Sequence, residues 1–421
     1  MPRKAVSSTM RKLKVKLWTN QYVIIISLTL VMFASFYMLT AGFPLFIATI
    51  NGNPAIAGTM TTTLMLASLI TRFFASVLIQ KVNMKWLLVI SLLYFMGTIG
   101  LTFVSQSIGF LIFIRALQGI GFSMLTILVV TISSNIVPKS RLGEGIVYFA
   151  MSMSVGTTLG PLIAISYLAH YSFRSMMILS LGLMSFSFVC SLFTKNTATK
   201  ETENPKATTH KPFYKYMFDK RVLLPSILVA LNYMAIAGTV NFMGAFGKEI
   251  NVGGRISQFF IAQGIAMIIV RAFSGKIFDR FGHRILIIPG AISGAAGLIL
   301  LGFSTRMWMV LVSGVLFGIA YAIIQPIIQA WALTLVPAET KATANSMLLI
   351  FIDSGLAIGS VALGFLAKNV GYGMTFSFSA GFMIIILLLY LIGSKKTVTS
   401  GAKTEKLPRA KFKLTYGRNK P

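Results

Sequence analysis

Residues 275–284 read Gly275-Lys-Ile-Phe-Asp279-Arg280-Phe-Gly282-His283-Arg284 and form a short charged stretch within an apolar region. On either side lie the apolar runs 255–278 and 284–303. Each run is long enough to cross about 30 Å of hydrocarbon as a helix that rises about 1.5 Å per residue. The charged stretch is therefore expected to be a tight connection between two membrane-spanning helices.

The rest of the chain continues this pattern of long apolar runs and short polar connections. The runs are continuously apolar rather than alternating, which favours helices over a membrane β-barrel. We expect twelve spanning helices, at 22–48, 56–80, 86–104, 108–136, 143–169, 173–194, 222–248, 255–278, 284–303, 307–336, 341–368 and 372–394.

The composition supports an integral membrane protein. Hydrophobic residues make up 56% of the 421 residues and charged residues only 11%, whereas soluble proteins carry about 25% charged residues. This excludes a soluble enzyme and a nucleic-acid-binding protein, despite the net charge of +29. One cysteine and three scattered histidines offer no disulfide framework, metal site or catalytic constellation. The sequence predicts no enzyme activity and no cofactor.

The basic residues predict the orientation in the membrane. With the N-terminus taken as cytoplasmic, thirty Lys and Arg residues fall on the inner side, five on the outer side and three within spans. Inner loops carry the basic excess in membrane proteins, so both termini are expected in the cytoplasm of a bacterial cell. The positive inner face is expected to attract anionic lipids.

The chain is expected to divide into two halves. A basic N-terminus (1–21) precedes the first six-helix bundle (22–194), a polar linker (195–221) precedes the second bundle (222–394), and a basic tail (395–421) follows. The halves repeat at an offset of 199 residues, which relates Thr40 to Thr239, Phe43 to Phe242, Arg72 to Arg271, Gly119 to Gly318, Pro138 to Pro337, Gly156 to Gly355, Gly160 to Gly359 and Gly182 to Gly381. This predicts two pseudo-symmetric bundles with a site at their interface.

Three motifs resemble those of the major facilitator superfamily. The stretch 275–284 is similar to its loop motif G-x-x-x-D-R-x-G-R-[RK], with His283 at one basic position. Arg115-Ala-Leu-Gln118-Gly119-Ile-Gly121 resembles the R-x-x-Q-G-x-G signature of proton-coupled members. Gly156-Thr-Thr-Leu-Gly160-Pro161-Leu-Ile-Ala164-Ile165 resembles the antiporter motif, without its final glycine pair.

The resemblance implies a twelve-span, all-α drug:proton antiporter that exports amphiphilic small molecules as a monomer, with the proton as coupling ion. Alternatives are an exporter of an endogenous metabolite, such as a siderophore or lipid-like anion, and a facilitator working inward. A membrane channel or enzyme is a remote alternative. Drug exporters of this superfamily often carry an acid in the first span, whereas residues 22–48 contain none.

The loop motif also implies a conformational latch. An Asp at the N-terminus of a neighbouring helix is stabilised by free N–H groups and by the helix dipole. Pseudo-symmetry places Asp279 near the start of the fifth span, whereas Gln80 holds the equivalent position in a decayed first copy. Alternatively, the charges merely set the topology. The latch residues are Gly275, Asp279, Arg280, Gly282, Arg284 and Arg141.

Asp353 is the first candidate for proton coupling. It lies about 18 Å into its span at 1.5 Å per residue, and carboxylates within membranes act in proton relays. Alternatively, it makes a helix–helix hydrogen bond. Arg115 is expected to tune that carboxyl, bind an anion or brace carbonyl groups, and Glu144 is a second candidate at a helix start. Arg72 and Arg271 are interpreted as structural partners of the loop motif.

The substrate cavity is expected among spans one, four, seven and ten, which line the pathway in the superfamily. The candidate lining residues are Phe36, Tyr37, Thr40, Arg115, Gln118, Asn232, Tyr233, Asn241, Tyr321, Gln325 and Gln329.

The basic excess yields a direct test of orientation. Epitope tags inserted at residue 200 and at the C-terminus should both resist surface labelling in intact cells, because both segments belong to the basic inner side. Labelling after permeabilisation serves as the control. Labelling of either tag in intact cells would contradict the predicted orientation.

Overall fold

The computed structural model describes residues 17–138, 141–195, 218–337 and 340–401, all of which lie in helices or short connections. The first half contains α1 (Asn20–Asn51), α2 (Pro54–Lys81), α3 (Met84–Leu101), α4 (Ile108–Ile136), α5 (Leu142–Leu168) and α6 (Phe173–Leu192). The second half contains η4 (Lys220–Val222), α7 (Leu223–Glu249), η5 (Gly253–Ser257), α8 (Gln258–Phe281), α9 (Arg284–Gly302), α10 (Met307–Thr334) and α11 (Lys341–Gly401).

The helix α11 contains two membrane crossings. Among the described residues, eleven helices are long and apolar enough to span a bilayer, but the 61 residues of α11 would be about 90 Å long if straight. The helix breaks at Gly371, whose φ of 80° lies in the left-handed region that favours glycine. Glu249 stabilises the break by accepting a hydrogen bond from the Tyr372 amide at 3.0 Å. The predicted division into twelve spans, 341–368 and 372–394 among them, agrees with this break.

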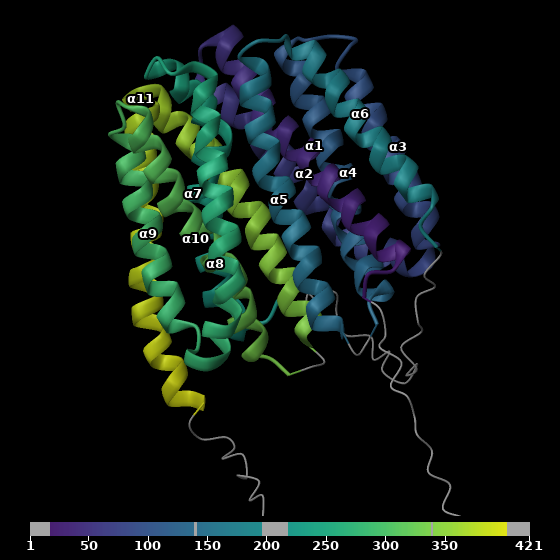
Figure 1. Cartoon of the computed structure of the whole chain (residues 1–421), viewed down its shortest axis with the longest axis vertical. Coiled ribbons are helices and arrows are strands. Elements are labelled where there is room, and N and C mark those ends of the chain that lie inside the picture. Colours follow the sequence, from purple (N-terminus) through teal and green to yellow (C-terminus); the bar gives the residue numbers. More distant parts are fainter. Residues whose placement is uncertain (1–16, 139–140, 196–217, 338–339, 402–421) are drawn as a thin grey trace, which may run out of the picture.

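The two halves lie side by side, the first in purple to blue and the second in green to yellow (Figure 1). Within the first half, α1 packs against α5 and α6, and α2 packs against α4. The second half repeats these contacts, with α7 against α11 and α8 against α10. The halves meet where α2 contacts α11, α1 contacts α7, and α5 contacts α8. Equivalent helices therefore form the two sides of the interface.

One end of the bundle carries most of the described basic residues at the helix ends and connections and is called the basic end. Helices α1, α3, α5, α7 and α9 begin there (Figure 1). It includes Lys85, Arg141, Arg221, Arg284 and Lys341.

At the opposite end, the two halves are in close contact. Thr61 donates a hydrogen bond to Asn241 at 2.6 Å, and Ser166 donates to Ser257 at 2.7 Å. A Cβ atom on Gly364 would lie 2.8 Å from the carbonyl oxygen of Pro54, so only a glycine allows this approach of α11 to α2. The structure is therefore closed at this end.

Hydrogen bonds between the halves become fewer toward the basic end. The last described hydrogen bonds across the interface are those of Arg72 with Asp353 and of Arg271 with Ser154. Both pairs lie more than two helical turns inside the basic ends of α2 and α8. No hydrogen bond between described residues joins the halves beyond them.

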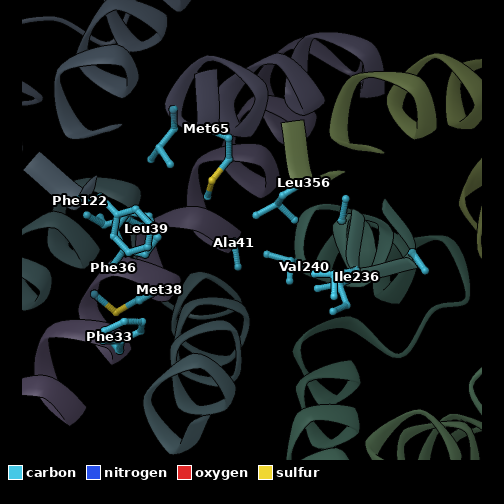
Figure 2. Close-up of a cluster of buried hydrophobic side chains, with 14 of the residues drawn as sticks. Phe33, Phe36, Met38, Leu39, Ala41, Met65, Phe122, Ile236, Val240 and Leu356 are labelled. Atoms are coloured by element: carbon cyan, nitrogen blue, oxygen red, sulfur yellow. The ribbon is translucent and has the colours of Figure 1, made fainter. Parts of the chain in front are cut away.

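A cluster of buried apolar side chains lies where helices of the two halves approach each other (Figure 2). Phe36 of α1 stacks on Phe122 of α4 with ring centroids 3.6 Å apart. On the other side of Ala41, Ile236 and Val240 of α7 belong to the same cluster, as Figure 2 shows. The middle of the molecule thus presents mainly apolar surface from both halves.

The contact at Gly364 predicts a conformational shift. Gly364→Val should push α11 away from α2 and open the closed end, because Val carries the Cβ that meets Pro54. The measurement is the distance between spin labels on cysteines at Ile50 and Lys368, in a Cys190→Ser background, which should lengthen.

Gly182→Val is the matched control, because a Cβ on Gly182 meets no atom within 4 Å. If Gly364→Val leaves the distance distribution unchanged, the glycine contact does not hold this end closed.

Candidate functional site

The carboxylate of Asp353 lies between the two halves and is fully engaged. Arg72 donates from Nε to Oδ2 at 2.6 Å and from a terminal nitrogen to Oδ1 at 3.3 Å. Ser68 donates to Oδ2 at 2.9 Å. Asp353 is only 2% exposed, so the charge is removed from lipid and held by three donors of the other half.

The sequence of α2 explains this geometry. Ser68 and Arg72 are four residues apart, so they lie one above the other on the same helix face. This face packs against α11. Charge-assisted bonds to a carboxylate are about twice as strong as neutral ones. Arg72 therefore has Asp353 as its partner, while its predicted contact with the loop motif stays a prediction, because the side chains of Gln80 and Asp279 lie outside the described residues.

Arg115 does not contact Asp353. It is fully buried within the first half, where it donates to Gln118 Oε1 at 2.7 Å and to the Met60 carbonyl oxygen at 3.3 Å. Its guanidinium lies 4.8 Å from the centroid of the Phe43 ring. Arg115 thus braces α4 against α2 and α1, which was one of the roles expected for it.

Glu144 lies at the surface of the basic end. Its carboxylate pairs with Arg141 at 2.7 Å across the first turn of α5, and both side chains are more than a third exposed. An exposed ion pair of this kind contributes at most about 1 kcal/mol. Asp353 therefore remains the stronger of the two candidates for proton coupling.

The loop motif is described in part. The backbone of Asp279 belongs to α8, but its side chain, like that of Gln80, lies outside the described residues, so the latch stays a prediction. Gly282 ends α8 with φ of 76°. Gly275, Arg280 and Arg284 are exposed at this end.

His283 anchors the loop to the second half. Its Nδ1 lies 2.6 Å from the Tyr390 hydroxyl oxygen, and its ring stacks on Trp331 with centroids 4.7 Å apart. Burial lowers the pKa of His283 and thus favours its uncharged form. It fixes the loop by packing rather than by charge.

The glycines of the fifth-span motif form a packing seam. A Cβ on Gly156 would lie 2.7 Å from the Leu30 carbonyl oxygen, and one on Gly160 would lie 2.6 Å from the Met38 nitrogen. Both contacts are to α1, while Pro161 lies one residue further inside α5. The equivalent Gly359 contacts Met234 of α7 in the same way. These glycines let α5 and α11 approach the central helices closely.

Three of the predicted cavity residues come together near the middle of the interface. Tyr37, Tyr233 and Tyr321, from α1, α7 and α10, lie within electrostatic range of one another, and Tyr37 and Tyr233 also lie within range of Asp353. All three are half-buried. We call them the tyrosine cluster.

The other predicted cavity residues have separate roles. Thr40 donates to the Phe36 carbonyl oxygen, Gln118 binds Arg115, and Asn241 joins Thr61 to Ser360 at the closed end. Asn232 is buried with its amide nitrogen unpartnered among the described residues.

A polar chain runs from α10 to α11. Gln325 donates to Gln329 at 3.0 Å, and Gln329 donates to Asn345 at 2.6 Å. Sequence reasoning missed Ser68, Ser154 and Asn345. The repeat offset could have indicated Ser154, because it relates this residue to Asp353.

Comparison with known proteins identifies the family. The family model described as Major Facilitator Superfamily matches residues 25–288 and 227–421. The chain belongs to the major facilitator superfamily. It is therefore a multi-pass membrane transporter and not an enzyme.

Its relatives by sequence are distant. An uncharacterized MFS-type transporter of Methanocaldococcus jannaschii is 28% identical over 309 residues, which cover 71% of this chain and 78% of the relative. Multidrug resistance protein 2 of Bacillus subtilis is 27% identical over 165 residues, covering 39% of this chain and 40% of its own length. The chain thus spans less than half of the drug resistance protein that it matches.

Solved structures confirm the fold. The nucleoside transporter NupG aligns with a TM-score of 0.73 at 14% identity, covering 89% of this chain and 99% of NupG. A bacterial Spinster homologue in an inward-facing, unoccupied conformation aligns with a TM-score of 0.71 at 14% identity, covering 90% and 98% of the two chains. At such identities the likeness shows the fold alone.

The Arg72–Asp353 pair yields a stability prediction. Arg72→Gln and Asp353→Asn should each lower the thermal stability of the purified protein, because removing one partner of a buried pair leaves the other unpaired. The double variant should lose less stability than the two single variants together, with a coupling energy of about 1–3 kcal/mol.

The exposed pair Arg141 and Glu144 is the matched control. A double-mutant cycle of Arg141→Gln and Glu144→Gln should give a coupling energy for stability below about 1 kcal/mol. Additive effects of Arg72→Gln and Asp353→Asn would show that the pair across the halves does not stabilise this state.

Proposed function

We propose that the protein is a proton-coupled secondary exporter of amphiphilic small molecules that works by alternating access. The observation that carries the proposal is the carboxylate of Asp353, held across the interface by Arg72 and Ser68. It is the only carboxylate that the sequence places near the middle of a span.

The geometry links the protonation of Asp353 to the position of the halves. When α2 and α11 separate, the carboxylate loses both partners, and a buried unpaired charge is costly. Taking up a proton removes that cost. Proton binding therefore competes with the ion pair to Arg72, so a proton shifts the equilibrium toward the separated state, and the separated state binds the proton more tightly.

The direction of transport is inferred from two resemblances. The fifth-span motif around Gly156 and Gly160 resembles that of antiporters, and distant partial relatives include multidrug resistance proteins. With the basic end in the cytoplasm, the closed end of the described state faces outward, which fits a transporter that loads its substrate from the inside. Export of an endogenous metabolite and inward facilitation are the alternatives.

The lining of the interface supports an amphiphilic substrate. Phe36 of the apolar cluster packs against Tyr37 of the tyrosine cluster with ring centroids 5.4 Å apart, and the tyrosine hydroxyl groups supply polar contacts. Such surfaces bind molecules that have both an apolar body and a polar group. We place the protein in the plasma membrane as a functional monomer, with anionic lipids at the basic end.

Transport by inverted vesicles with an imposed pH gradient tests this function. Wild-type protein should accumulate members of a drug and metabolite panel only when the gradient is present. Asp353→Asn should abolish accumulation, because the amide keeps hydrogen bonds but cannot titrate, and should retain downhill exchange.

The comparison variant is Glu144→Gln, which alters the exposed carboxylate and should retain gradient-driven accumulation. Undiminished accumulation by Asp353→Asn would reject this residue as the proton carrier. Accumulation without any gradient would reject proton coupling altogether.

A further inference from the structure

The internal repeat reproduces the arginine of the Arg72–Asp353 pair but not its acid. An offset of 199 residues relates Arg72 to Arg271 and also relates Ser154 to Asp353. The structure keeps both contacts, since Arg271 donates a hydrogen bond to Ser154 between α8 and α5. Each arginine therefore binds the repeat-related position of the facing helix, but on one side a hydroxyl replaces the carboxylate.

Arg271 is left with unused hydrogen-bonding capacity. Its Nε is buried and has no acceptor among the described residues. At the equivalent position, the Nε of Arg72 makes the shortest bond to Asp353, at 2.6 Å. A guanidinium has five N–H donors in a planar fork that matches a carboxylate or phosphate. Arg271 thus has a free donor for a further partner, and the shape of its fork suits an anion.

No acid among the described residues pairs with Arg271. Only nine acidic residues occur in the sequence, and Asp353 is already bound to Arg72. On α8 itself, Asp279 lies eight residues further on, a rise of about 12 Å. The remaining acids lie in connections, tails or at helix ends and are Glu144, Glu201, Glu203, Asp219, Glu249, Glu339 and Glu405.

The surroundings of Arg271 suit the polar group of an amphiphile. Thr157, one turn from Ser154 on α5, lies 3.4 Å from the hydroxyl oxygen of Tyr321, and Tyr233 and Tyr321 lie within electrostatic range of Arg271. A cavity of about 10 Å³ borders Arg271 and Ser154. Its other walls are apolar: Met151, Val155, Met267 and Ile268.

The charge balance of the interior favours the same ligand class. Three arginines, Arg72, Arg115 and Arg271, lie within spans together with one midspan acid, Asp353. The excess positive charge attracts anions and repels cations at short range.

We propose that Arg271, assisted by Ser154, binds the carboxylate, phosphate or sulfonate group of an amphiphilic anion between α5 and α8. The inference rests on the proposed transport function and specifies its substrate class. The anion takes the place that Asp353 occupies on the other side. Because the cavity is small in this state, α5 and α8 must move apart as the ligand enters. Binding at this site therefore shifts the equilibrium toward the state in which the two halves are separated here.

A matched set of fluorescent probes tests the site. The probes are 11-(dansylamino)undecanoic acid, its neutral methyl ester and an analogue with a terminal ammonium group. Binding to the purified protein in phosphatidylcholine nanodiscs is measured by dansyl fluorescence. The wild type should bind the acid at least tenfold more tightly than the ester or the ammonium analogue.

Two variants locate the binding to Arg271. Arg271→Gln should weaken binding of the acid at least tenfold and leave the ester unaffected. Ser154→Asp should do the same without removing the arginine, because it supplies the missing carboxylate and recreates the pair seen at Arg72. It therefore also covers the case in which Arg271→Gln fails to fold. The control Arg306→Gln removes an exposed positive charge at the opposite end and should bind like the wild type.

The lipid composition of the nanodiscs distinguishes a lipid headgroup from a free anion as the ligand of this site. If phosphatidylglycerol in the nanodiscs weakens binding of the acid to the wild type but not to Arg271→Gln, a lipid headgroup occupies the site. If it has no effect, the site is for a free anion. Wild-type affinity of both Arg271→Gln and Ser154→Asp for the acid, or equal binding of acid and ester, would overturn the proposal.

Transport distinguishes this inference from the proposed function. If the acid binds through Arg271 but is not transported when a pH gradient is imposed, the anion site is supported and proton-coupled export is rejected. If gradient-driven transport of the acid is unchanged in Arg271→Gln and Ser154→Asp, the export stands and this site is wrong.

Discussion

A carboxylate in the middle of a membrane bundle must be paired or protonated, and the structure depends on how this requirement is met for Asp353. The acid belongs to α11 of one half, whereas Arg72 and Ser68 belong to α2 of the other. The charge of one side chain and the separation of two six-helix bundles are therefore physically linked. In the proposed mechanism this link converts a proton gradient into movement.

The internal repeat gives two interfaces with the same helix contacts and different chemistry. At α2 and α11 an arginine meets an acid, while at α5 and α8 the equivalent Arg271 meets Ser154. The two repeats thus share the arrangement of their helices but differ in the side chains that meet between the halves. This divergence would let one side of the interface carry the proton and the other bind the substrate.

Uncharged contacts determine the rest of the interface. In lipid, helices gain little from hydrophobic association with one another, so close packing and a few hydrogen bonds decide which surfaces meet. Gly364 allows α11 to reach the backbone of α2, and Phe36 and Val240 belong to the apolar cluster beside it. Contacts of this kind can separate without exposing charge, which suits an interface that must open.

The sequence by itself determined the all-helical membrane fold class and the positions of the long apolar helices. These are local properties, because a helix in hydrocarbon satisfies its backbone hydrogen bonds within itself and must be long and apolar enough to cross. The predicted fifth span at 143–169, for example, is observed at Leu142–Leu168. Only the tertiary structure decided the partners: Arg72 binds an acid 281 residues away, and Arg115 braces its own half. Partner choice depends on how two bundles dock, which no local pattern contains.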